Sequence, residues 1–245
     1  YTDTNCPGQV TSITGAFGLP EVNTTSFQYD PVTCNLTKTI DSLLKETTLT
    51  YDSKGNVQTS LDAEGKLTTS TYDFMNRLIQ VQDHDNGLTT YSYDAEGNLI
   101  SVTDAENTTT TFTYDSLNRL KTTTDPLGKT ETFSYDNNGN LIQTKDRRLQ
   151  TIDFEYDAVN QLKKKTLAGL LATNYTYDSL GDLLTVTDPD SSLTFTYDPV
   201  SRLTSSSTSG SPVQPNILIS YTYDKNGNRK TLNDGSGITN YNYDN

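Results

Sequence analysis

The dipeptide Tyr-Asp recurs along the chain at a nearly fixed spacing, and this spacing restricts the fold more than any other feature. Most intervals between successive copies are 21 residues. A period of this size indicates one supersecondary unit copied end to end, in which each copy buries surface against its neighbours. We therefore expect a repeat array whose function lies on the assembled surface. The repeat tyrosines are Tyr29, Tyr51, Tyr72, Tyr93, Tyr114, Tyr135, Tyr156, Tyr177, Tyr197, Tyr223 and Tyr243.

Each copy carries two turn signals. Its frame reads Tyr-Asp-x-x-Gly-Asn-Leu, a short strand-like run, Asp-x-x-Gly, a Thr-rich run and the next aromatic-x-Tyr-Asp. Asp at the first turn position accepts backbone hydrogen bonds, and Gly or Asn at the last position tolerates a left-handed backbone. Gly97 and Asn118 are examples of the two residue types. The frame predicts a β-hairpin in every copy, with a second turn leading to the next copy.

The runs between the turns have the pattern of strands. The residue two before the repeat Tyr is aromatic in most copies, as in Phe112-Thr113-Tyr114, and alternate residues of a strand share one face. Only 32% of residues are hydrophobic and Trp is absent, which argues against a deep, compact core. We predict an all-β fold of tandem 21-residue hairpins, with about 22 strands in a long coiled antiparallel sheet that forms a spiral or a ribbon.

The residue at the last position of the first turn alternates between Gly and Asn in successive copies, which gives a period of 42 residues. A three-residue loop would pair Tyr93 with Leu99 and Tyr114 with Leu120. Odd loops preserve parity, so an odd repeat would place successive Tyr-Leu pairs on opposite faces. On this pairing, Ile100, Val102, Phe112, Tyr114 and Leu120 would share a drier face, opposite Lys121, Thr123 and Glu131. The alternative is duplication of a 42-residue unit without structural meaning.

Two segments depart from the frame. Residues 1–28 carry it only faintly, and we expect them to form a modified, capping rung before the array of residues 29–245. The interval between Tyr197 and Tyr223 grows to 26 residues. The additional length falls in a Ser- and Thr-rich stretch at about 204–216, which is typical of an exposed loop.

The charge balance limits the partners. The formal net charge is -13, which argues against binding to nucleic acid or to anionic membrane surfaces. No apolar run of 18 residues is present, so membrane insertion is not expected. The sequence begins at Tyr1 without Met and without a signal-peptide pattern, as expected for a mature product or for a segment of a longer protein.

The two cysteines, Cys6 and Cys34, lie in similar turn-like stretches about one copy apart. If adjacent copies stack, these turns are neighbours, and a disulfide would join the first rung to the second. The alternative is a pair of unpaired buried thiols. A disulfide would indicate an oxidising environment, and we expect a secreted protein that is extracellular or at the cell surface.

The sequence contains four Asn-x-Ser/Thr triplets, which are candidate glycosylation sites. Some of them are expected by chance in so Thr-rich a chain. Asn107 falls at a predicted turn tip and is the most accessible candidate. The four asparagines are Asn23, Asn35, Asn107 and Asn174.

The motifs Tyr-Asp-x-x-Gly-Asn-Leu and Tyr-Asp-x-x-Asn-Arg-Leu at 21-residue spacing resemble the YD repeats of the Rhs family, over residues 29–245. The family includes bacterial polymorphic toxins, subunits of insecticidal toxin complexes, wall-associated proteins and teneurins of animal cell surfaces. The resemblance implies a long antiparallel ribbon that spirals into a shell, which in the toxins encloses a cytotoxic polypeptide. No segment here resembles the family's C-terminal plug, with its autoproteolytic aspartates, or a toxin domain. We therefore do not expect this chain to enclose a cargo alone.

The sequence does not indicate an enzyme, and it predicts no catalytic, cofactor-binding or metal site. His84 is the single histidine and falls in a predicted turn without a nucleophile motif. The repeated aspartates recur as identical turn residues, whereas glycosidase chemistry needs one distinctive pair. The turns that begin at Asp136 and Asp224 weakly resemble calcium loops, but they lack the terminal bidentate acidic residue.

Three functions fit these observations. The first is a non-enzymatic extracellular structural protein, in which unpaired terminal strands pair head to tail into a fibre or wall. The second is a fragment of an Rhs-type shell that encloses a toxin. The third is adhesion through surface glycans, with sugars stacked on the aromatic rows, although aromatic rows in a sheet more often serve packing.

Overall fold

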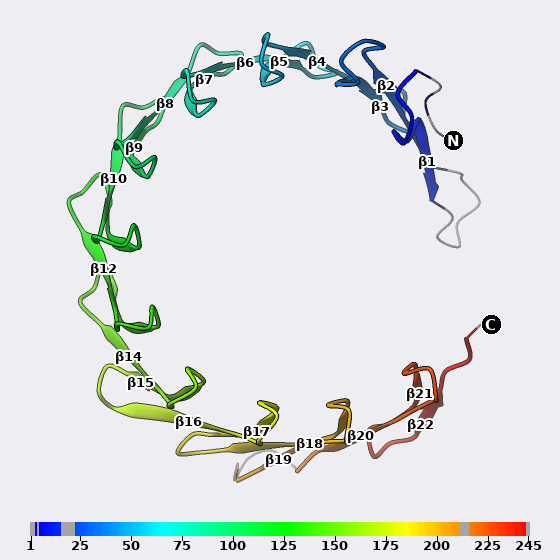
Figure 1. Ribbon diagram of the computed structural model, residues 1–245, viewed down its shortest axis with the longest axis vertical. Coiled ribbons are helices and arrows are strands. Elements are labelled where there is room, and N and C mark those ends of the chain that lie inside the picture. Colours follow the sequence, from blue (N-terminus) through cyan, green and yellow to red (C-terminus); the bar gives the residue numbers. More distant parts are fainter. Residues whose placement is uncertain (1–2, 4, 16–22, 211–215, 244–245) are drawn as a thin grey trace. The chain divides into compact units, whose positions relative to one another are not determined.

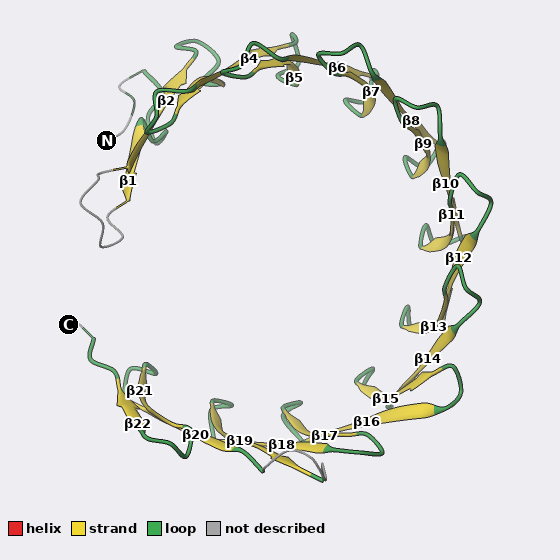
Figure 2. Ribbon diagram, turned by 180° about the vertical axis from the view of Figure 1, so that it is seen from behind, coloured by secondary structure: helices red, strands yellow, loops and turns green. Residues whose placement is uncertain are grey.

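The computed structural model describes residues 3, 5–15, 23–210 and 216–243 of the chain. These residues form strands and turns, without a helix among them (Figure 1, Figure 2). The predicted all-β class is therefore confirmed, and the described strands number 22, in agreement with the expected count.

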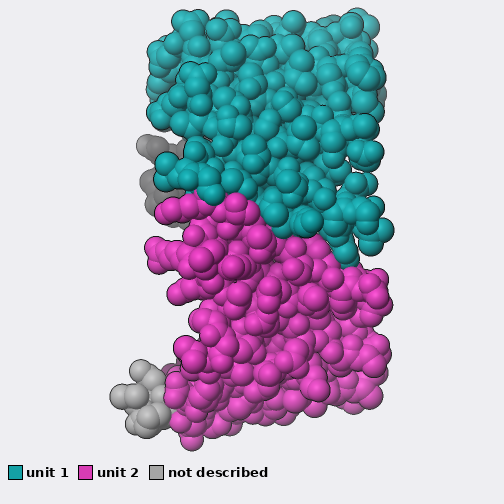
Figure 3. Space-filling view, turned by 90° about the vertical axis from the view of Figure 1, so that its left-hand side faces the viewer, with its two compact units in different colours: residues 1–128 teal, residues 129–245 magenta. Residues whose placement is uncertain are grey.

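The chain divides into two compact units, residues 1–128 and 129–245 (Figure 3). The strands of the first unit are β1 (Ser12–Gly15), β2 (Asn23–Tyr29), β3 (Leu36–Ile40), β4 (Glu46–Tyr51), β5 (Val57–Leu61), β6 (Leu67–Tyr72), β7 (Leu78–Gln82), β8 (Leu88–Tyr93), β9 (Leu99–Thr103), β10 (Thr109–Tyr114) and β11 (Leu120–Thr124). Those of the second unit are β12 (Thr130–Tyr135), β13 (Leu141–Lys145), β14 (Thr151–Tyr156), β15 (Leu162–Leu167), β16 (Leu171–Tyr177), β17 (Leu183–Thr187), β18 (Ser192–Tyr197), β19 (Leu203–Ser209), β20 (Leu218–Tyr223), β21 (Arg229–Asn233) and β22 (Ile238–Asn240).

Within each unit, every strand pairs antiparallel with the strand that precedes it and the strand that follows it in the sequence. The strands contact these sequence neighbours and no other strand in the described part of the chain. One set of turns follows the repeat tyrosines, and we call these the YD turns; the other set begins at the second Asp of each copy. In an antiparallel meander, the two sets lie along opposite edges of the sheet.

The predicted pairing across the YD turns is confirmed, but a β-bulge accompanies it. Tyr93 pairs with Leu99, whereas Ser92 pairs with Ser101, so Ile100 is an additional residue on β9. The same register shift occurs at the other YD turns, for example between β14 and β15. A bulge inserts one residue into one strand and so reverses the parity that the odd loop would preserve.

The predicted alternation of faces is therefore wrong. The bulge offsets the odd repeat, and the repeat tyrosines of each unit all lie on one face of its sheet. Thr123 pairs with Phe112 and so lies on the tyrosine face, not opposite it. In the second unit, Glu131 shares the tyrosine face because it lies two residues before Phe133 on β12. Ile100 is the bulge residue and remains 37% exposed.

The two faces of each sheet carry different cross-strand pairs. The tyrosine face pairs most of its aromatic residues with Leu, Val or Thr, as in Tyr175 opposite Val186, although Phe154 lies opposite Lys165. The other face carries threonine pairs, such as Thr113 and Thr122, whose hydroxyl oxygens lie 2.6 Å apart. Both kinds of pair stabilise a sheet by a fraction of a kcal/mol to about 1 kcal/mol each.

The sheets have no deep core. Cys6 is the one residue whose side chain is fully buried among those described, and most of the tyrosine face is half-buried. The composition-based expectation of a thin, extended sheet is thus confirmed. In Figure 1 each unit, taken by itself, bends toward the side on which its YD turns project.

The domain prediction stays a prediction, with one correction. Of the predicted capping rung, β1 and the start of β2 are described, while residues 16–22 lie outside the described residues. The stretch expected to be a loop at 204–216 begins as a strand, since β19 continues to Ser209. Threonine favours strands, but a run rich in Ser and Thr is also typical of exposed loops. Composition alone therefore does not distinguish a strand from a loop here. Residues 211–215 lie outside the described part.

Candidate functional site

The YD turns carry the features that recur in every copy, and they form the candidate functional surface. In a typical turn, the backbone N–H of Gly55 donates to the carbonyl oxygen of Asp52 at 3.1 Å, and the backbone N–H of Asn56 donates to the Asp52 carboxylate at 2.9 Å. Gly55 has a φ of 87° and Asn118, at the same position of another copy, has a φ of 60°. The predicted chemistry of Asp at the start and a left-handed residue at the end is confirmed.

The repeat tyrosines join each copy to the one before it. The hydroxyl of Tyr93 donates to the carbonyl oxygen of Leu78 at 2.8 Å, and that of Tyr156 donates to the carbonyl oxygen of Leu141 at 2.9 Å. The acceptor is the first strand residue after the preceding YD turn. The same bond is made by Tyr51, Tyr72, Tyr114, Tyr177, Tyr223 and Tyr243, whereas the hydroxyl of Tyr29 donates to the carbonyl oxygen of Val10, before β1.

A second link to the next copy is made by an arginine that directly follows the left-handed residue of some YD turns. The Nε atom of Arg77 lies 2.7 Å from Oδ2 of Asp73 in its own turn. The Arg77 guanidinium carbon lies 4.7 Å from the centre of the Tyr93 ring, and one terminal nitrogen donates to the carbonyl oxygen of Asp94 at 3.4 Å. One arginine thus holds its own turn, the next tyrosine and the next turn together.

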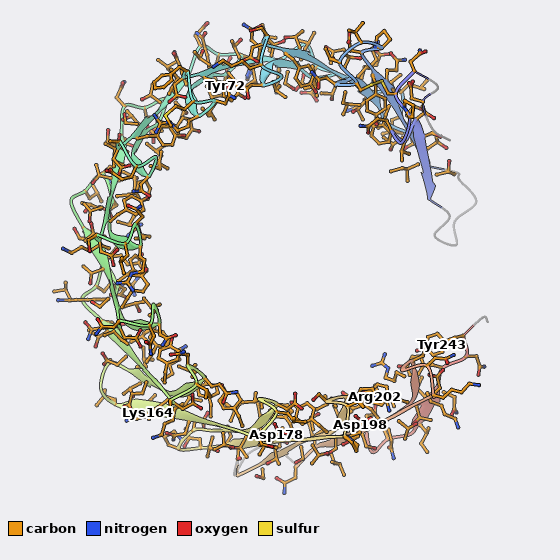
Figure 4. All side chains as sticks on the ribbon, viewed as in Figure 1. Tyr72, Lys164, Asp178, Asp198, Arg202 and Tyr243 are labelled. Atoms are coloured by element: carbon orange, nitrogen blue, oxygen red, sulfur yellow. A yellow bond between two sulfur atoms is a disulfide. The ribbon has the colours of Figure 1, made fainter. Side chains whose placement is uncertain are left out.

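Arg202 repeats this arrangement in the second unit. It lies 2.7 Å from Oδ2 of Asp198, and its guanidinium carbon lies 4.7 Å from the centre of the Tyr223 ring. Figure 4 labels Arg202 and Asp198 where they lie at the same turn. The recurrence in both units shows that the link belongs to the repeat and not to one copy.

Other YD turns end in asparagine and make a different link. The Nδ2 atom of Asn98 donates to Oδ2 of Asp94 at 2.9 Å and to Oδ1 of Asn118, in the next turn, at 3.0 Å. Asn56 and Asn140 make the corresponding contacts. The 42-residue alternation therefore has a structural role at the turns: an Asn link reaches the left-handed Asn of the next turn, and that turn ends in an Arg, or in one copy Gln161.

The YD turn at 178–182 departs from both types. Asp182 stands where the other copies carry Asn, Arg or Gln, and its Oδ2 atom is buried without a hydrogen-bond partner. Its backbone N–H still donates to the Asp178 carboxylate at 2.9 Å. This turn therefore keeps the backbone geometry of the repeat but lacks the side-chain donor.

The hydrogen bonds shift the ionisation of the turn residues. The side-chain amides of Asn56 and Asn98 lower the pKa of Asp52 and Asp94, respectively. Partial burial raises the pKa of repeat tyrosines such as Tyr51. Both shifts favour the protonation states in which aspartate accepts hydrogen bonds and tyrosine donates them at neutral pH.

The predicted disulfide is present between Cys6 and Cys34, whose Cα atoms lie 5.5 Å apart. It joins the segment before β1 to the YD turn that follows β2. In the chain-entropy description, closing a loop of 28 residues stabilises the fold by about 3.6 kcal/mol. A disulfide is also an indication of a non-cytoplasmic environment.

The other predicted site residues lie apart from one another. Asn107 is exposed at a turn tip, Asn174 is exposed on β16 and Asn35 is half-buried just before β3. The side chain of Asn23 lies outside the described residues, and glycosylation of all four stays a prediction. His84 lies in a turn, with Nε2 3.1 Å from Oδ2 of the adjacent Asp85.

Two findings concern metals and membranes. Among the described residues, no three His, Cys, Asp or Glu side chains are grouped as they would be to hold a metal ion. Within the same ranges, no helix has the length and apolar character needed to cross a membrane.

The sequence reasoning missed the side chains that link the turns. The signal is present in the sequence, because the residue directly after the left-handed Gly or Asn is Arg or Asn in most copies and the choice follows the 42-residue period. The sequence pattern alone suggests an alternation between the faces of the sheet, whereas the structure places the alternation along the YD-turn edge.

The teneurin YD-shell family matches residues 33–190, and the RHS repeat matches residues 177–212. Among curated proteins, no sequence matches the chain.

Solved structures of Tc toxin components share the fold. A crystal structure of TcdB2-TccC3-TEV aligns with a TM-score of 0.63 and 17% identity, over 91% of this chain and 14% of that one. A structure of the Photorhabdus luminescens Tc holotoxin pore, with a point mutation in TccC3, aligns with a TM-score of 0.50 and 16% identity, over 94% of this chain and 18% of that one. This chain thus spans less than one fifth of the length of either matched chain.

Proposed function

This chain belongs to the teneurin YD-shell family, and we propose on that basis that it forms part of the wall of a hollow shell that encloses a polypeptide. The role proposed for the chain itself is structural and non-catalytic. The shell would act outside the cytoplasm, in keeping with the Cys6–Cys34 disulfide.

The observation that carries the proposal is the constant face of the repeat tyrosines. Because the bulge compensates for the odd repeat, every copy of a unit places its tyrosine on the same side, and each copy can bend the sheet in the same direction. A sheet that bends in one direction at every hairpin is suited to a curved wall. Alternating faces would cancel this bend in successive copies and favour a flat ribbon.

The links between copies also suit a wall. The Tyr93 hydroxyl and the Arg77 guanidinium each contact the neighbouring copy, so the copies are joined by side chains in addition to the strand ladder. A thin sheet without a deep core needs such contacts, because burial alone stabilises it weakly. The wall would thereby resist opening without being thick.

Assembly into a head-to-tail fibre is the main alternative, and it stays a prediction. It would require the edge strands of different subunits to pair with one another. The family relationship and the constant bend favour the shell. The glycan-binding alternative is independent of this choice.

Protease protection of the native, full-length gene product tests the proposal. If the chain is part of a shell wall, segments enclosed by it should resist a protease until a mild denaturant opens the wall, and should then be cleaved quickly. Cleavage throughout the product before the wall opens would overturn the proposal. Long fibres in the same preparation, seen by electron microscopy, would favour the alternative.

A further inference from the structure

Two pockets of the second unit are built from the same positions of two different copies. The first lies between the YD turn at 157–161 and the segment 175–181, with a volume of about 690 Å³. The second lies between the YD turn at 224–228 and the segment 241–243, with a volume of about 340 Å³. Both volumes fall in the range of roughly 300 to 1,000 Å³ that is typical of small-molecule sites.

Both pockets share a turn aspartate, an amide side chain, a lysine and two tyrosines separated by one residue; the first also contains Asp178, and the second Asn226 and Asn242. The corresponding pairs are Asp157 and Asp224, Gln161 and Asn228, Lys163 and Lys230, Tyr175 and Tyr241, and Tyr177 and Tyr243. Figure 4 labels Asp178 and Tyr243, one residue from each pocket.

The combination of lysine with two tyrosines distinguishes these copies. Lys163 is the bulge residue of β15, and the equivalent residue is Ile100 on β9 and Ile142 on β13. Along the whole sequence, a bulge lysine followed by Tyr-x-Tyr occurs in these two copies alone. The backbone of the repeat needs neither residue type, because other copies form the same hairpin without them.

The tyrosine rings are held in place. The hydroxyl of Tyr177 donates to the carbonyl oxygen of Leu162 at 3.0 Å, and that of Tyr243 donates to the carbonyl oxygen of Arg229 at 2.9 Å. The Arg229 guanidinium carbon lies 4.5 Å from the centre of the Tyr241 ring and covers one side of it. Rings that are oriented in advance lose little entropy when a ligand binds.

We propose that the two pockets are binding sites for the pyranose ring of a neutral sugar. The electron-rich face of a tyrosine attracts the slightly positive C–H groups on one side of a pyranose. Carboxylate, amide and ammonium groups at the rim supply both acceptors and donors for the sugar hydroxyls. The first pocket is lined by two carboxylates, Asp157 and Asp178, and one ammonium group, Lys163, so it disfavours an anionic ligand and offers both acceptors and donors to a neutral one.

Two sites on one sheet also suit a repeating glycan. Each site alone would be weak, with a dissociation constant on the order of 1 mM. A chain that displays the same sugar at several positions could occupy both sites and gain from multivalency. This use of the surface is independent of the shell proposal.

Saturation-transfer NMR on the intact 245-residue chain tests the proposal, with glucose, galactose, mannose and N-acetylglucosamine as probes. The test variant is Tyr175→Leu with Tyr241→Leu, which is compatible with folding because Leu49 occupies the equivalent position in another copy. The matched control is Tyr91→Leu, at the same position of a copy whose bulge residue is Ile79.

We expect saturation transfer to at least one sugar, with affinity that falls about tenfold or more in the double variant and is unchanged in the control. A second variant, Lys163→Ile with Lys230→Ile, should weaken binding while leaving the circular dichroism spectrum unchanged. No transfer to any of the four sugars would overturn the proposal. Equal loss of binding in the Tyr91→Leu control, or no loss in either pocket variant, would also overturn it.

Discussion

Replacing Asp182 with asparagine should stabilise the chain, because this residue interrupts a contact that other YD turns make. In those turns, the Nδ2 atoms of Asn56, Asn98 and Asn140 donate to the carboxylate of their own turn aspartate at 2.9 Å. Asp182 lacks the side-chain amide that donates in those turns, and its Oδ2 atom is buried without a partner. Asparagine has nearly the same shape and supplies the missing donor toward Asp178.

The magnitude follows from the type of bond. A hydrogen bond to a charged group contributes about 1.5 to 3 kcal/mol when it is well buried, and this turn is partly exposed, so we expect a gain of about 1 to 2 kcal/mol. For a chain of this size, 1 kcal/mol corresponds to a shift of about 2 to 4 °C in the unfolding midpoint. The Asp182→Asn variant should therefore melt at a temperature roughly 2 to 8 °C higher.

Thermal unfolding followed by far-ultraviolet circular dichroism measures this shift. Hydrogen exchange of peptides from residues 178–197 would show whether the gain is local, as expected for an array with nearest-neighbour coupling. The reverse change, Asn140→Asp, is the matched control and should lower the midpoint, since it removes the donor to Asp136. An Asp182→Asn variant that is no more stable than the wild type would refute this account of the turns.

Three further results are expected. Tyr93→Phe should lower the free energy of unfolding by about 1 kcal/mol, because it removes the bond to the Leu78 carbonyl; denaturant unfolding would measure this, and an unchanged midpoint would contradict it. Cys34→Ser should cost about 3.6 kcal/mol by loop entropy, with early loss of exchange protection in β1 and β2 but not in the second unit. The folded pKa of Asp52 lies below its usual 3.8, so the stability that this carboxylate contributes is present above pH 4 and is lost as the pH falls through the folded pKa. Acid titration followed by circular dichroism should show unfolding in that pH range, and a flat signal to low pH would count against this expectation.

The hairpins could be predicted from the sequence because their determinants are local. Asp at the first turn position and Gly97 or Asn118 at the last encode the turn within a few residues, and the predicted pairing of Tyr93 with Leu99 is confirmed. The disulfide between Cys6 and Cys34 could be predicted for a related reason, since both cysteines occupy turns of adjacent copies.

The face of the sheet on which each repeat tyrosine lies could not be predicted from loop length alone. A bulge changes which residues share a face, but it leaves no strong mark in composition, because the bulge residue is Ile100 in one copy and Lys163 in another. One additional residue per hairpin places the tyrosines of successive copies on the same face, where loop length alone predicts opposite faces.

The links between turns depend on contacts 17 to 22 residues apart in the sequence, such as Arg77 with Asp94 and Asn138 with Asn160. These contacts arise only after the bulge and the bend bring successive turns together. The sequence showed the alternation of residue types, but the partners of Arg and Asn followed from the geometry of neighbouring copies.

Electron cryo-microscopy of the native, full-length gene product tests the central claim most directly. If the chain is part of a shell wall, the map should show a hollow particle whose wall contains this antiparallel sheet, with polypeptide density enclosed by it. A solid fibre in which the sheets of successive subunits join edge to edge, with no enclosed volume, would contradict the account.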